Sequence, residues 1–279
     1  MPLIKDVYQE LLSSIENTSV EKSSFDILFQ NFLNFENQVE VELHAFDEMP
    51  DYKLLKKQLN RLLIGEPVQY IINKGYFYGN EFYVDNRVLI PRMETEELID
   101  LCLHHTKGLE SPVVYDICTG SGCLGITFKM KNENALVYLS DISKDALSVA
   151  KKNAEKFNVN VKMIESDLLN NFKNTKKADI ILCNPPYISK HEVIDDIVWN
   201  NEPHLALIPP SGDGIEMYKK LFKTLPKHLN DMAYIFFEIG CEQKQELTEL
   251  IKKYLPNSYY CFHIDMMGKT RILEIRYSK

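Results

Sequence analysis

The chain has 279 residues, of which 45% are hydrophobic, and a formal net charge of −8. These values are typical of a globular protein with about two domains and a full core. The acidic balance disfavours an enzyme that scans nucleic acid, because such an enzyme carries a basic surface for phosphates. No apolar run approaches the roughly 20 residues that span a bilayer, so we expect no contact with a membrane.

The cysteines and histidines predict neither a disulfide framework nor a metal site. The six cysteines form no Cys-x-x-Cys pair, and the seven histidines form no His-Glu-x-x-His or Cys/His cluster. Reduced, structural thiols indicate a reducing compartment. The first residues, Met1-Pro-Leu-Ile-Lys-Asp, lack the apolar segment of a signal peptide. We therefore expect a cytoplasmic protein that needs no metal.

Residues 1–75 predict a small helical domain, because their apolar residues recur at helical spacing, as in Leu3, Val7, Leu11 and Ile15. Asp51 is a candidate N-cap for the last long helix and Gly65 a candidate stop. This segment holds 12 acidic and 7 basic residues, a net charge of −5. It is either a cap that stabilises the rest of the chain or a clamp that recognises a protein substrate, and a charged helical surface does not decide between them.

The segment 76–88 reads as an aromatic-rich hairpin linker with a Gly-Asn turn, and from residue 89 to 279 strand and helix patterns alternate. Strands are expected near 113–117, 136–140, 161–164, 178–183, 233–239, 259–265 and 271–277, with helices near 94–106, 122–131, 143–157, 214–226 and 241–253. Such alternation predicts an α/β fold with a mostly parallel seven-stranded sheet. The final strand must be antiparallel, because the short connection 266–270 cannot make a parallel crossover.

A glycine-rich turn after the first of these strands predicts a nucleoside site. Gly120 and Gly122 lie between that strand and a helix, and Asp141 follows 21 residues after Gly120, which suits a ribose diol. A turn of this kind alone equally indicates NAD or FAD. However, the turn has no Lys or Arg for a pyrophosphate, whereas Asp116 and Asp167 add carboxylates. A cationic, phosphate-free ligand such as S-adenosylmethionine is therefore favoured, with Asp141 on its ribose and Asp167 on its adenine.

The sequence Asn184-Pro185-Pro186-Tyr187 follows the apolar run 178–183. The prolines fix an extended exit from that strand and contribute carbonyls without competing N–H donors. The Asn184 side-chain oxygen and the Pro185 carbonyl would then form a rigid pair of acceptors for a planar NH2 group, with the Tyr187 ring as a wall. The alternative is an Asn-Pro turn that merely ends a strand.

These motifs, with four further blocks, resemble the peptide chain release factor glutamine methyltransferases, the HemK family. The shared blocks are Leu89-Ile-Pro-Arg-Met-Glu-Thr-Glu96, Asp116 to Gly125, Ser140-Asp141, Ser166-Asp167, Asn184 to Ile188, Glu202-Pro-His-Leu-Ala-Leu207, Gly212-Asp-Gly214 and Glu238-Ile-Gly240. The resemblance extends from about Gly65 onward. It departs from the family pattern at Cys118, where a glycine is usual, and at Leu168, often an aromatic beside the adenine.

The resemblance implies a class I S-adenosylmethionine-dependent, Rossmann-like methyltransferase fold with an all-α N-terminal domain that recognises the substrate. It implies cofactor contacts at Asp116, Cys118, Thr119, Gly120, Ser121, Gly122, Asp141, Asp167, Leu168 and Asn184, and substrate contacts at Asn184, Pro185, Pro186 and Tyr187, with Asn184 and Pro185 catalytic. The methyl acceptor would be the glutamine of the Gly-Gly-Gln motif of a release factor, the second product S-adenosylhomocysteine, and the enzyme a monomer that binds no nucleic acid.

Three alternatives remain at this point. A glutamine methyltransferase for a ribosomal protein carries nearly the same motifs. An adenine-N6 methyltransferase of nucleic acid would use the same acceptors on a flipped base, although it would need a basic surface. A nucleotide-binding module without catalysis is disfavoured by the intact segment 184–187.

Overall fold

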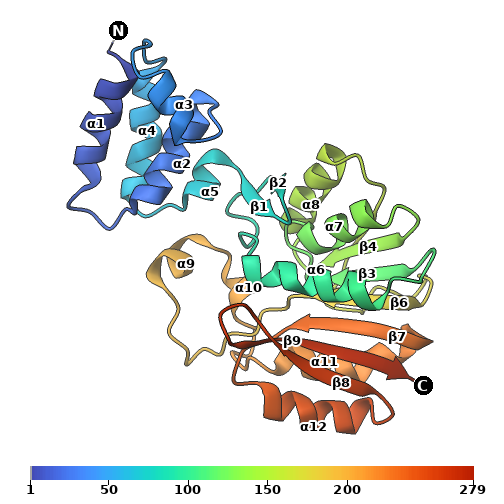
Figure 1. The fold of residues 1–279 in the computed structure, drawn as a ribbon. Coiled ribbons are helices and arrows are strands. Elements are labelled where there is room, and N and C mark those ends of the chain that lie inside the picture. Colours follow the sequence, from blue (N-terminus) through green and yellow to red (C-terminus); the bar gives the residue numbers. More distant parts are fainter. Residues whose placement is uncertain (1) are drawn as a thin grey trace. The chain divides into compact units, whose positions relative to one another are not determined.

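The computed structural model describes residues 2–279, which form two compact units. One unit comprises residues 2–74 with Asp195–Asn201, and the other comprises Gly75–Ile194 with Glu202–Lys279. The sequence-based division placed residues 195–201 in the α/β domain, whereas the structure groups them with the helical unit. Figure 1 shows the elements of both units in chain order.

The helical unit is built from short amphipathic helices. They are α1 (Ile4–Ile15), α2 (Lys22–Leu33), α3 (Gln38–Leu43), α4 (Tyr52–Leu63), α5 (Val68–Ile72) and α9 (Asp196–Asn201). Phe25 and Phe29 are fully buried in its core, and Tyr8 packs edge-on against Phe29. The Asp51 side chain accepts a hydrogen bond from the Leu54 N–H at 3.2 Å, which confirms this N-cap. Helix α4 ends before Gly65, where φ is +91°.

The second unit contains a seven-stranded sheet in the order β5-β4-β3-β6-β7-β9-β8. Its strands are β3 (Val113–Ile117), β4 (Leu136–Asp141), β5 (Lys162–Glu165), β6 (Ala178–Cys183), β7 (Leu229–Glu238), β8 (Tyr259–Ile264) and β9 (Thr270–Ser278). Strands β3 to β7 pair in parallel, and β9 is antiparallel to both β7 and β8. This confirms the predicted fold class.

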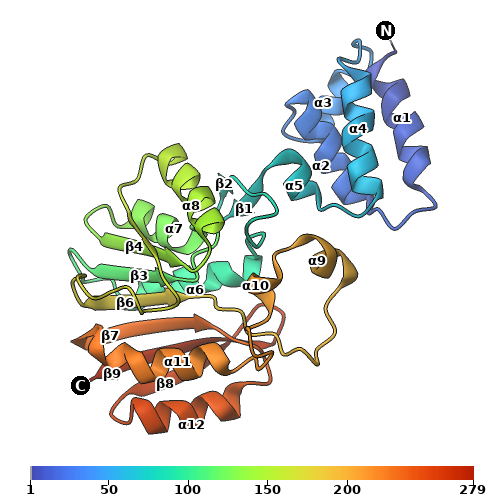
Figure 2. The same cartoon turned by 180° about the vertical axis from the view of Figure 1, so that it is seen from behind.

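Helices cover both faces of the sheet. They are α6 (Met93–His105), α7 (Cys123–Lys131), α8 (Lys144–Lys156), α11 (Glu216–Thr224) and α12 (Lys244–Tyr254). The unit also contains the short helix α10 (His204–Leu207) and a 3-10 turn η1 (Leu225–Lys227). Alternate residues of β3 face opposite ways: Tyr115 joins the core under α11 and α12, and Val114 joins the core under α6, α7 and α8. Figure 2 shows α11 and α12 together on their face. Burial on both faces explains why these strands are continuously apolar.

Two local expectations need correction. The hairpin, β1 (Gly75–Phe77) with β2 (Asn80–Phe82), turns at Tyr78 and Gly79 with φ of +52° and +72°, one residue before the predicted Gly-Asn turn. Both central residues of this turn need positive φ, and Asn80 is instead paired with Phe77 in the ladder. Helices α9 and α10 were not predicted, because six and four residues are too few to show helical periodicity.

Candidate functional site

The strand order creates a crevice at the carboxyl edge of the sheet. The chain runs from β3 outward through β4 and β5, then returns to β6 on the other side of β3. Open parallel sheets bind ligands at such a reversal. Ile117 and Cys183 are paired in the β3–β6 ladder, so the segments that follow, from Cys118 and from Asn184, leave the sheet side by side.

A pocket opens at this edge within the second unit. Nine of the residues predicted for the site line it: Cys118, Thr119, Gly120, Ser121, Asp141, Asp167, Leu168, Asn184 and Pro186. The other predicted residues, Asp116, Gly122, Pro185 and Tyr187, lie outside the lining set. Segments distant in sequence contribute to the wall. They include Arg87, Val88, Leu89, Pro91 and Arg92 before α6, Pro203, Leu205 and Ala206 at α10, and Met217 and Lys220 on α11.

The three glycines of the turn, Gly120, Gly122 and Gly125, differ in backbone conformation and surroundings. Gly120 has φ of +54°, and a Cβ added there would meet no atom within 4 Å, so its backbone borders open space. Gly122 has φ of +84°. Gly125 lies under the sheet edge, where an added Cβ would stand 2.3 Å from Leu139 Cδ2 and 2.9 Å from Asp116 Cβ. Gly120 therefore permits close approach of a ligand, whereas Gly125 permits close packing of α7 on the sheet.

Asp116 supports the turn from behind the pocket wall. It is fully buried, and its Oδ2 accepts hydrogen bonds from Thr119 Oγ1 at 2.5 Å and from the Gly125 N–H at 2.8 Å. Burial raises the pKa of Asp116 to about 7, and these two hydrogen bonds oppose the rise. Through its hydrogen bonds with Thr119 and Gly125, Asp116 holds the glycine turn against the end of β3.

Asp141 ends β4 at the pocket. Its Oδ2 accepts a hydrogen bond from the Gly120 N–H at 3.0 Å, and its Oδ1 accepts one from the Ser143 N–H at 2.9 Å. Burial raises its pKa, and hydrogen bonds from backbone N–H groups of Ser143 and Gly120 oppose that rise. Because each carboxylate oxygen can accept more than one hydrogen bond, Asp141 retains acceptor capacity for a ligand hydroxyl.

Three basic side chains also line the pocket, but each is paired with its own carboxylate. The pairs are Arg87 with Asp85 at 2.6 Å, Arg92 with Glu202 at 2.5 Å, and Lys220 with Glu216 at 2.5 Å. Asp141 and Asp167, in contrast, contact backbone N–H groups and an amide side chain. Counted with these partners, the wall has five carboxylates and three basic side chains, of which Lys220 also attracts Asp167. Its net charge is therefore negative, which agrees with the expected cationic ligand and disfavours a pyrophosphate.

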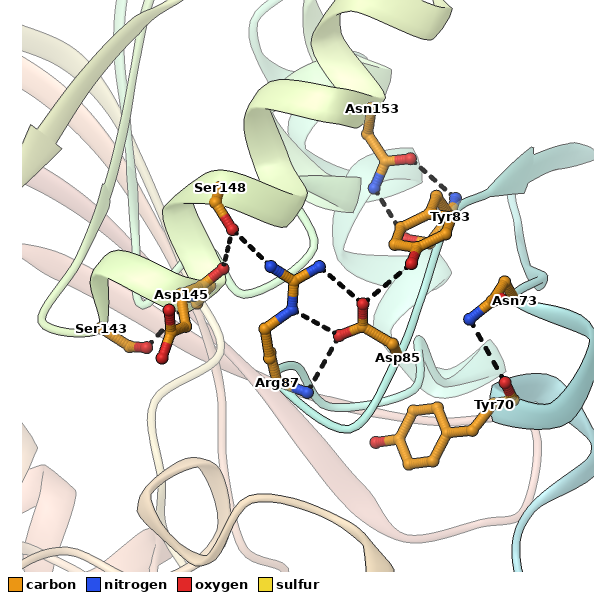
Figure 3. A network of polar contacts seen from close by, with 10 residues as sticks. Tyr70, Asn73, Tyr83, Asp85, Arg87, Ser143, Asp145, Ser148 and Asn153 are labelled. Carbon is orange, nitrogen blue, oxygen red and sulfur yellow. Dashed lines mark hydrogen bonds and ion pairs between the residues drawn. The ribbon is translucent and has the colours of Figure 1, made fainter. Parts of the chain in front are cut away.

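Side chains of helix α8 bind the chain segment before α6, which forms part of the pocket wall. Asn153 is fully buried; its Oδ1 accepts from the Tyr83 N–H at 2.7 Å, and its Nδ2 donates to the carbonyls of Tyr83 and Ser121, each at 2.9 Å. Arg87 Nη1 donates to Ser148 Oγ at 2.7 Å, and Arg87 Nε and Nη2 donate to the Asp85 carboxylate. Figure 3 shows both contacts with α8. One amide thus fixes the linker and the glycine turn to the same helix.

The sequence motif that contains Arg92 is in contact with the motif that contains Glu202. Glu202 is buried, and it accepts from Arg92 Nη2 with Oε1 and from the Ile90 N–H at 3.1 Å with Oε2. This charge-assisted pair joins residues 110 apart in sequence. It holds the segment before α6 beside the segment that leads into α10, and both line the pocket.

The segment 184–187 is held by a polar network at the end of β7. Asn184 Nδ2 donates to Thr95 Oγ1 at 3.2 Å, and the Tyr187 hydroxyl donates to Glu238 Oε1 at 2.9 Å. Gln243 Nε2 donates to the Tyr187 carbonyl at 2.9 Å. A Cβ at Gly214 would stand 2.3 Å from that same carbonyl, so Gly214 leaves the space in which this segment is secured.

Sequence reasoning gave no role to Thr95, Asn153, Glu202, Glu238 or Gln243. Thr95, Glu202 and Glu238 do stand in the motif blocks, next to the residues that signalled the family. Asn153 and Gln243 carry no local signal, because an amide on a helical pattern is ordinarily a solvated residue. The Asn153 partners Tyr83 and Ser121 and the Gln243 partner Tyr187 are 32 to 70 residues away in sequence.

Both departures from the family pattern have left-handed backbone. Cys118 has φ of +59° and Leu168 has φ of +51°. Glycine adopts this region without strain, whereas other residues are held there only by their surroundings. Cys118 packs against the core under α11 and Leu168 is buried in it, and this packing supports side chains at positions where the backbone favours glycine.

Residues 2–279 contain neither a membrane-spanning helix nor a cluster of metal-binding side chains. In this part of the chain no helix is long and apolar enough to cross a membrane. No group of three or more His, Cys, Asp or Glu side chains in the same residues could hold a metal ion.

Comparisons with known proteins agree on the fold and identify the family. Residues 89–204 match the family model of the methyltransferase small domain. The T. thermophilus 16S rRNA N2 G1207 methyltransferase, solved in complex with AdoMet and guanosine, shares the fold with a TM-score of 0.55 at 15% identity, over 74% of this chain and 50% of that one.

Three bacterial relatives, each named a release factor glutamine methyltransferase, match most of the chain. The Bacillus subtilis protein is 42% identical over 216 residues, which is 75% of this chain and 75% of that protein. The Mycoplasma mycoides protein is 35% identical over 86% of this chain and 88% of its own length. The Flavobacterium psychrophilum protein is 31% identical over 97% of this chain and 96% of its own length. The chain belongs to the family of release factor glutamine methyltransferases.

Proposed function

We propose that the protein transfers a methyl group from S-adenosylmethionine to the side-chain amide nitrogen of the Gly-Gly-Gln glutamine of a peptide chain release factor, as a cytoplasmic monomer. The observation that carries this proposal is the position of Asn184, which lines the pocket while its Nδ2 is bound to Thr95. The amide oxygen, on the other side of Cγ, is then free to accept from a substrate NH2 group. The activity in the names of the relatives supports the same substrate.

The residues of the pocket fit S-adenosylmethionine. Asp141 has acceptor capacity for the ribose hydroxyls, and Asp167 with Leu168 stands where the adenine would bind. The negative wall suits the sulfonium and the ammonium of this ligand, and the open backbone at Gly120 allows its close approach. When bound, the cofactor would supply an electrophilic methyl group. Asp116 and Gly122 would act by shaping the turn from behind.

The protein's own contribution is to position the amide. An amide nitrogen is a weak nucleophile that no side chain deprotonates in advance near neutral pH, so a general base does not solve the problem. Alignment of nitrogen, methyl carbon and sulfur can contribute up to ~7–11 kcal/mol. The new carbon–nitrogen bond forms as the carbon–sulfur bond breaks, giving S-adenosylhomocysteine, and the methylated nitrogen then loses a proton to water.

Asn184 and Pro185 would stabilise the transition state. As positive charge grows on the substrate N–H groups, their hydrogen bonds to the Asn184 Oδ1 and the Pro185 carbonyl become stronger. Pro185 and Pro186 are buried, which keeps this backbone rigid. The Tyr187 hydroxyl is occupied by Glu238 and contacted by Arg271 Nη1 at 3.2 Å, so Tyr187 acts as a support for the segment.

The decisive assay supplies labelled S-adenosylmethionine with a purified release factor, a ribosomal-protein mixture, or DNA in separate reactions. We expect label in the release factor, on the glutamine of Gly-Gly-Gln by mass spectrometry, and none when that glutamine is replaced by alanine. Label in a ribosomal protein or in adenine, with an unmodified release factor, would overturn the proposed substrate. Calorimetry that detects NADH binding and no S-adenosylmethionine binding would overturn the proposed cofactor.

Asn184→Ala tests the chemistry at the segment 184–187. The substitution removes one acceptor whose importance increases in the transition state, so kcat should fall by about 10²-fold or more. Affinity for the release factor, which depends on remote contacts, should change little. Because Pro185 and Pro186 remain, the fold should survive, and circular dichroism checks this. Single-turnover methylation near the wild-type rate would show that Asn184 only ends a strand.

A further inference from the structure

A buried chain of hydrogen bonds leads from Asn184 into the core of the second unit. Asn184 Nδ2 donates to Thr95 Oγ1 at 3.2 Å, and Thr95 Oγ1 donates to Glu238 Oε2 in a short hydrogen bond. Thr95 lies in the first turn of α6 and Glu238 ends β7. Both are 3% exposed, so water does not compete for these contacts. Three elements that are far apart in the sequence therefore meet behind one amide.

When Glu238 is ionised and can only accept, the direction of each hydrogen bond in this chain is fixed. Arg271 Nη1 can only donate, and it donates to the Tyr187 hydroxyl at 3.2 Å, so the Tyr187 hydrogen goes to Glu238 Oε1. The second oxygen of Glu238 takes the hydrogen of Thr95. With its single hydrogen committed, the Thr95 oxygen can only accept. Asn184 must therefore turn its NH2 group toward Thr95 and its oxygen away.

The orientation of this amide decides whether Asn184 can hold a substrate amide. With the oxygen outward, Asn184 accepts a hydrogen bond from the NH2 of the glutamine. With the amide flipped, two NH2 groups would face each other and neither could accept. An asparagine without such a partner has no reason to prefer one orientation, since its oxygen and nitrogen are nearly equal in size.

We infer that Thr95 and Glu238 are positioning residues that lock the Asn184 amide with its oxygen toward the methyl acceptor. This inference deepens the proposed function and rests on it. Thr95 and Glu238 belong to the blocks before α6 and after β7, which gives those two motif blocks a physical link to the segment 184–187. Burial raises the pKa of Glu238, and hydrogen bonds from Thr95 and Tyr187 and the charge of Arg271 oppose the rise.

Thr95→Val tests the inference, because valine keeps the shape of threonine and removes the hydroxyl. The single-turnover methylation rate should fall on the order of 10- to 100-fold, as expected for a misoriented reacting group, with little change in KM for the release factor. Thr95→Ser retains the hydroxyl and should restore most of the rate. Thr127→Val is the matched control, because Thr127 is fully buried on α7 and its Oγ1 has no partner among the described residues.

A double-mutant cycle separates positioning from a general structural effect. If Thr95 acts only through Asn184, then Thr95→Val should reduce the rate no further in a protein that already carries Asn184→Ala. Additive losses in the double variant, or a Thr95→Val rate equal to that of Thr127→Val, would overturn the inference. Thermal unfolding of each variant identifies any rate loss that comes from partial unfolding.

A spectroscopic measurement tests the orientation without relying on methylation. In protein labelled with 15N-asparagine, one Asn184 side-chain N–H should be protected from exchange by its bond to Thr95. Protection should disappear in Thr95→Val and persist in Thr95→Ser and Thr127→Val. Unprotected Asn184 hydrogens in the wild type would refute the locked amide even if the release factor is methylated. Protected hydrogens with an unmodified release factor would instead refute the proposed substrate.

Discussion

At the residue scale, the glycine turn shows that one motif contains two physical requirements. Gly120 and Gly125 belong to the same pattern, yet an added Cβ meets nothing within 4 Å at Gly120 and meets Leu139 Cδ2 at 2.3 Å at Gly125. The first position concerns a ligand and the second concerns packing. The pattern alone does not distinguish them, because both appear in the sequence as a glycine.

Gly120→Ala should therefore mainly impair ligand binding, whereas Gly125→Ala should mainly impair stability. Gly120→Ala should destabilise the fold by only about 1–2 kcal/mol, the cost of a left-handed alanine, but should weaken S-adenosylmethionine binding markedly. Gly125→Ala should destabilise the fold by about 1–3 kcal/mol or more through overpacking. Chemical denaturation and calorimetric titration of both variants measure the two effects. Equal losses of binding and stability in the two variants would contradict this division.

At the element scale, α8 organises the wall of the pocket. Asn153 on this helix satisfies the N–H and the carbonyl of Tyr83 and the carbonyl of Ser121. The hairpin formed by β1 and β2 is too short to be stable alone. Its attachment to α8 through Tyr83, with Phe82 in the core between the hairpin and α8, holds the linker that leads to Arg87.

Asn153→Ala should be strongly destabilising. The buried carbonyl of Ser121 and the part-buried N–H and carbonyl of Tyr83 would lose their partner. An unsatisfied buried group costs about 1–3 kcal/mol and a part-buried group less, so we expect a total loss of about 3 kcal/mol. Ser148→Ala on the same helix is the control: Ser148 is exposed, and its hydroxyl contacts Arg87 and the Asp145 carbonyl, so its effect should be below about 1 kcal/mol. Urea unfolding provides the comparison, and similar losses for the two variants would show that Asn153 does not anchor the wall.

At the scale of the whole molecule, the buried carboxylate behind the glycine turn makes stability depend on pH. The pKa of Asp116 is raised to about 7 in the folded protein, against about 4 for an exposed aspartate. Between these values the folded protein holds a proton that the unfolded chain has released. The contribution of Asp116 to stability is therefore greatest below about pH 4 and decreases as the pH rises to about 7.

Asp116→Asn should reduce this dependence, because asparagine does not titrate and still offers an oxygen to Thr119 and Gly125. We expect the free energy of unfolding of the wild type to decrease more between pH 5 and pH 8 than that of Asp116→Asn. The measurement is urea unfolding at both pH values without cofactor. Parallel pH profiles for the two proteins would show that Asp116 titrates normally.

The features that depend on local pattern could be predicted from the sequence alone. The period of the apolar residues predicted the alternation of strands and helices, and a five-residue connection required β8 and β9 to be antiparallel. The N-cap at Asp51 and the stop at Gly65 also follow from local chemistry. The motif blocks predicted the family, because residues such as Asn184 and Asp141 follow the strands that place them at one edge of a parallel sheet.

Which distant residues contact each other could not be predicted from the sequence and is known from the fold. Asn153 reaches Tyr83 across 70 residues, Glu202 reaches Arg92 across 110, and Thr95 reaches Glu238 across 143. The fold also placed Asp116 behind the pocket wall and grouped residues 195–201 with the helical unit. A side-chain hydrogen bond forms wherever the packed chain brings a donor and an acceptor together. That packing depends on the whole core, so the local periodicity of apolar residues does not predict it.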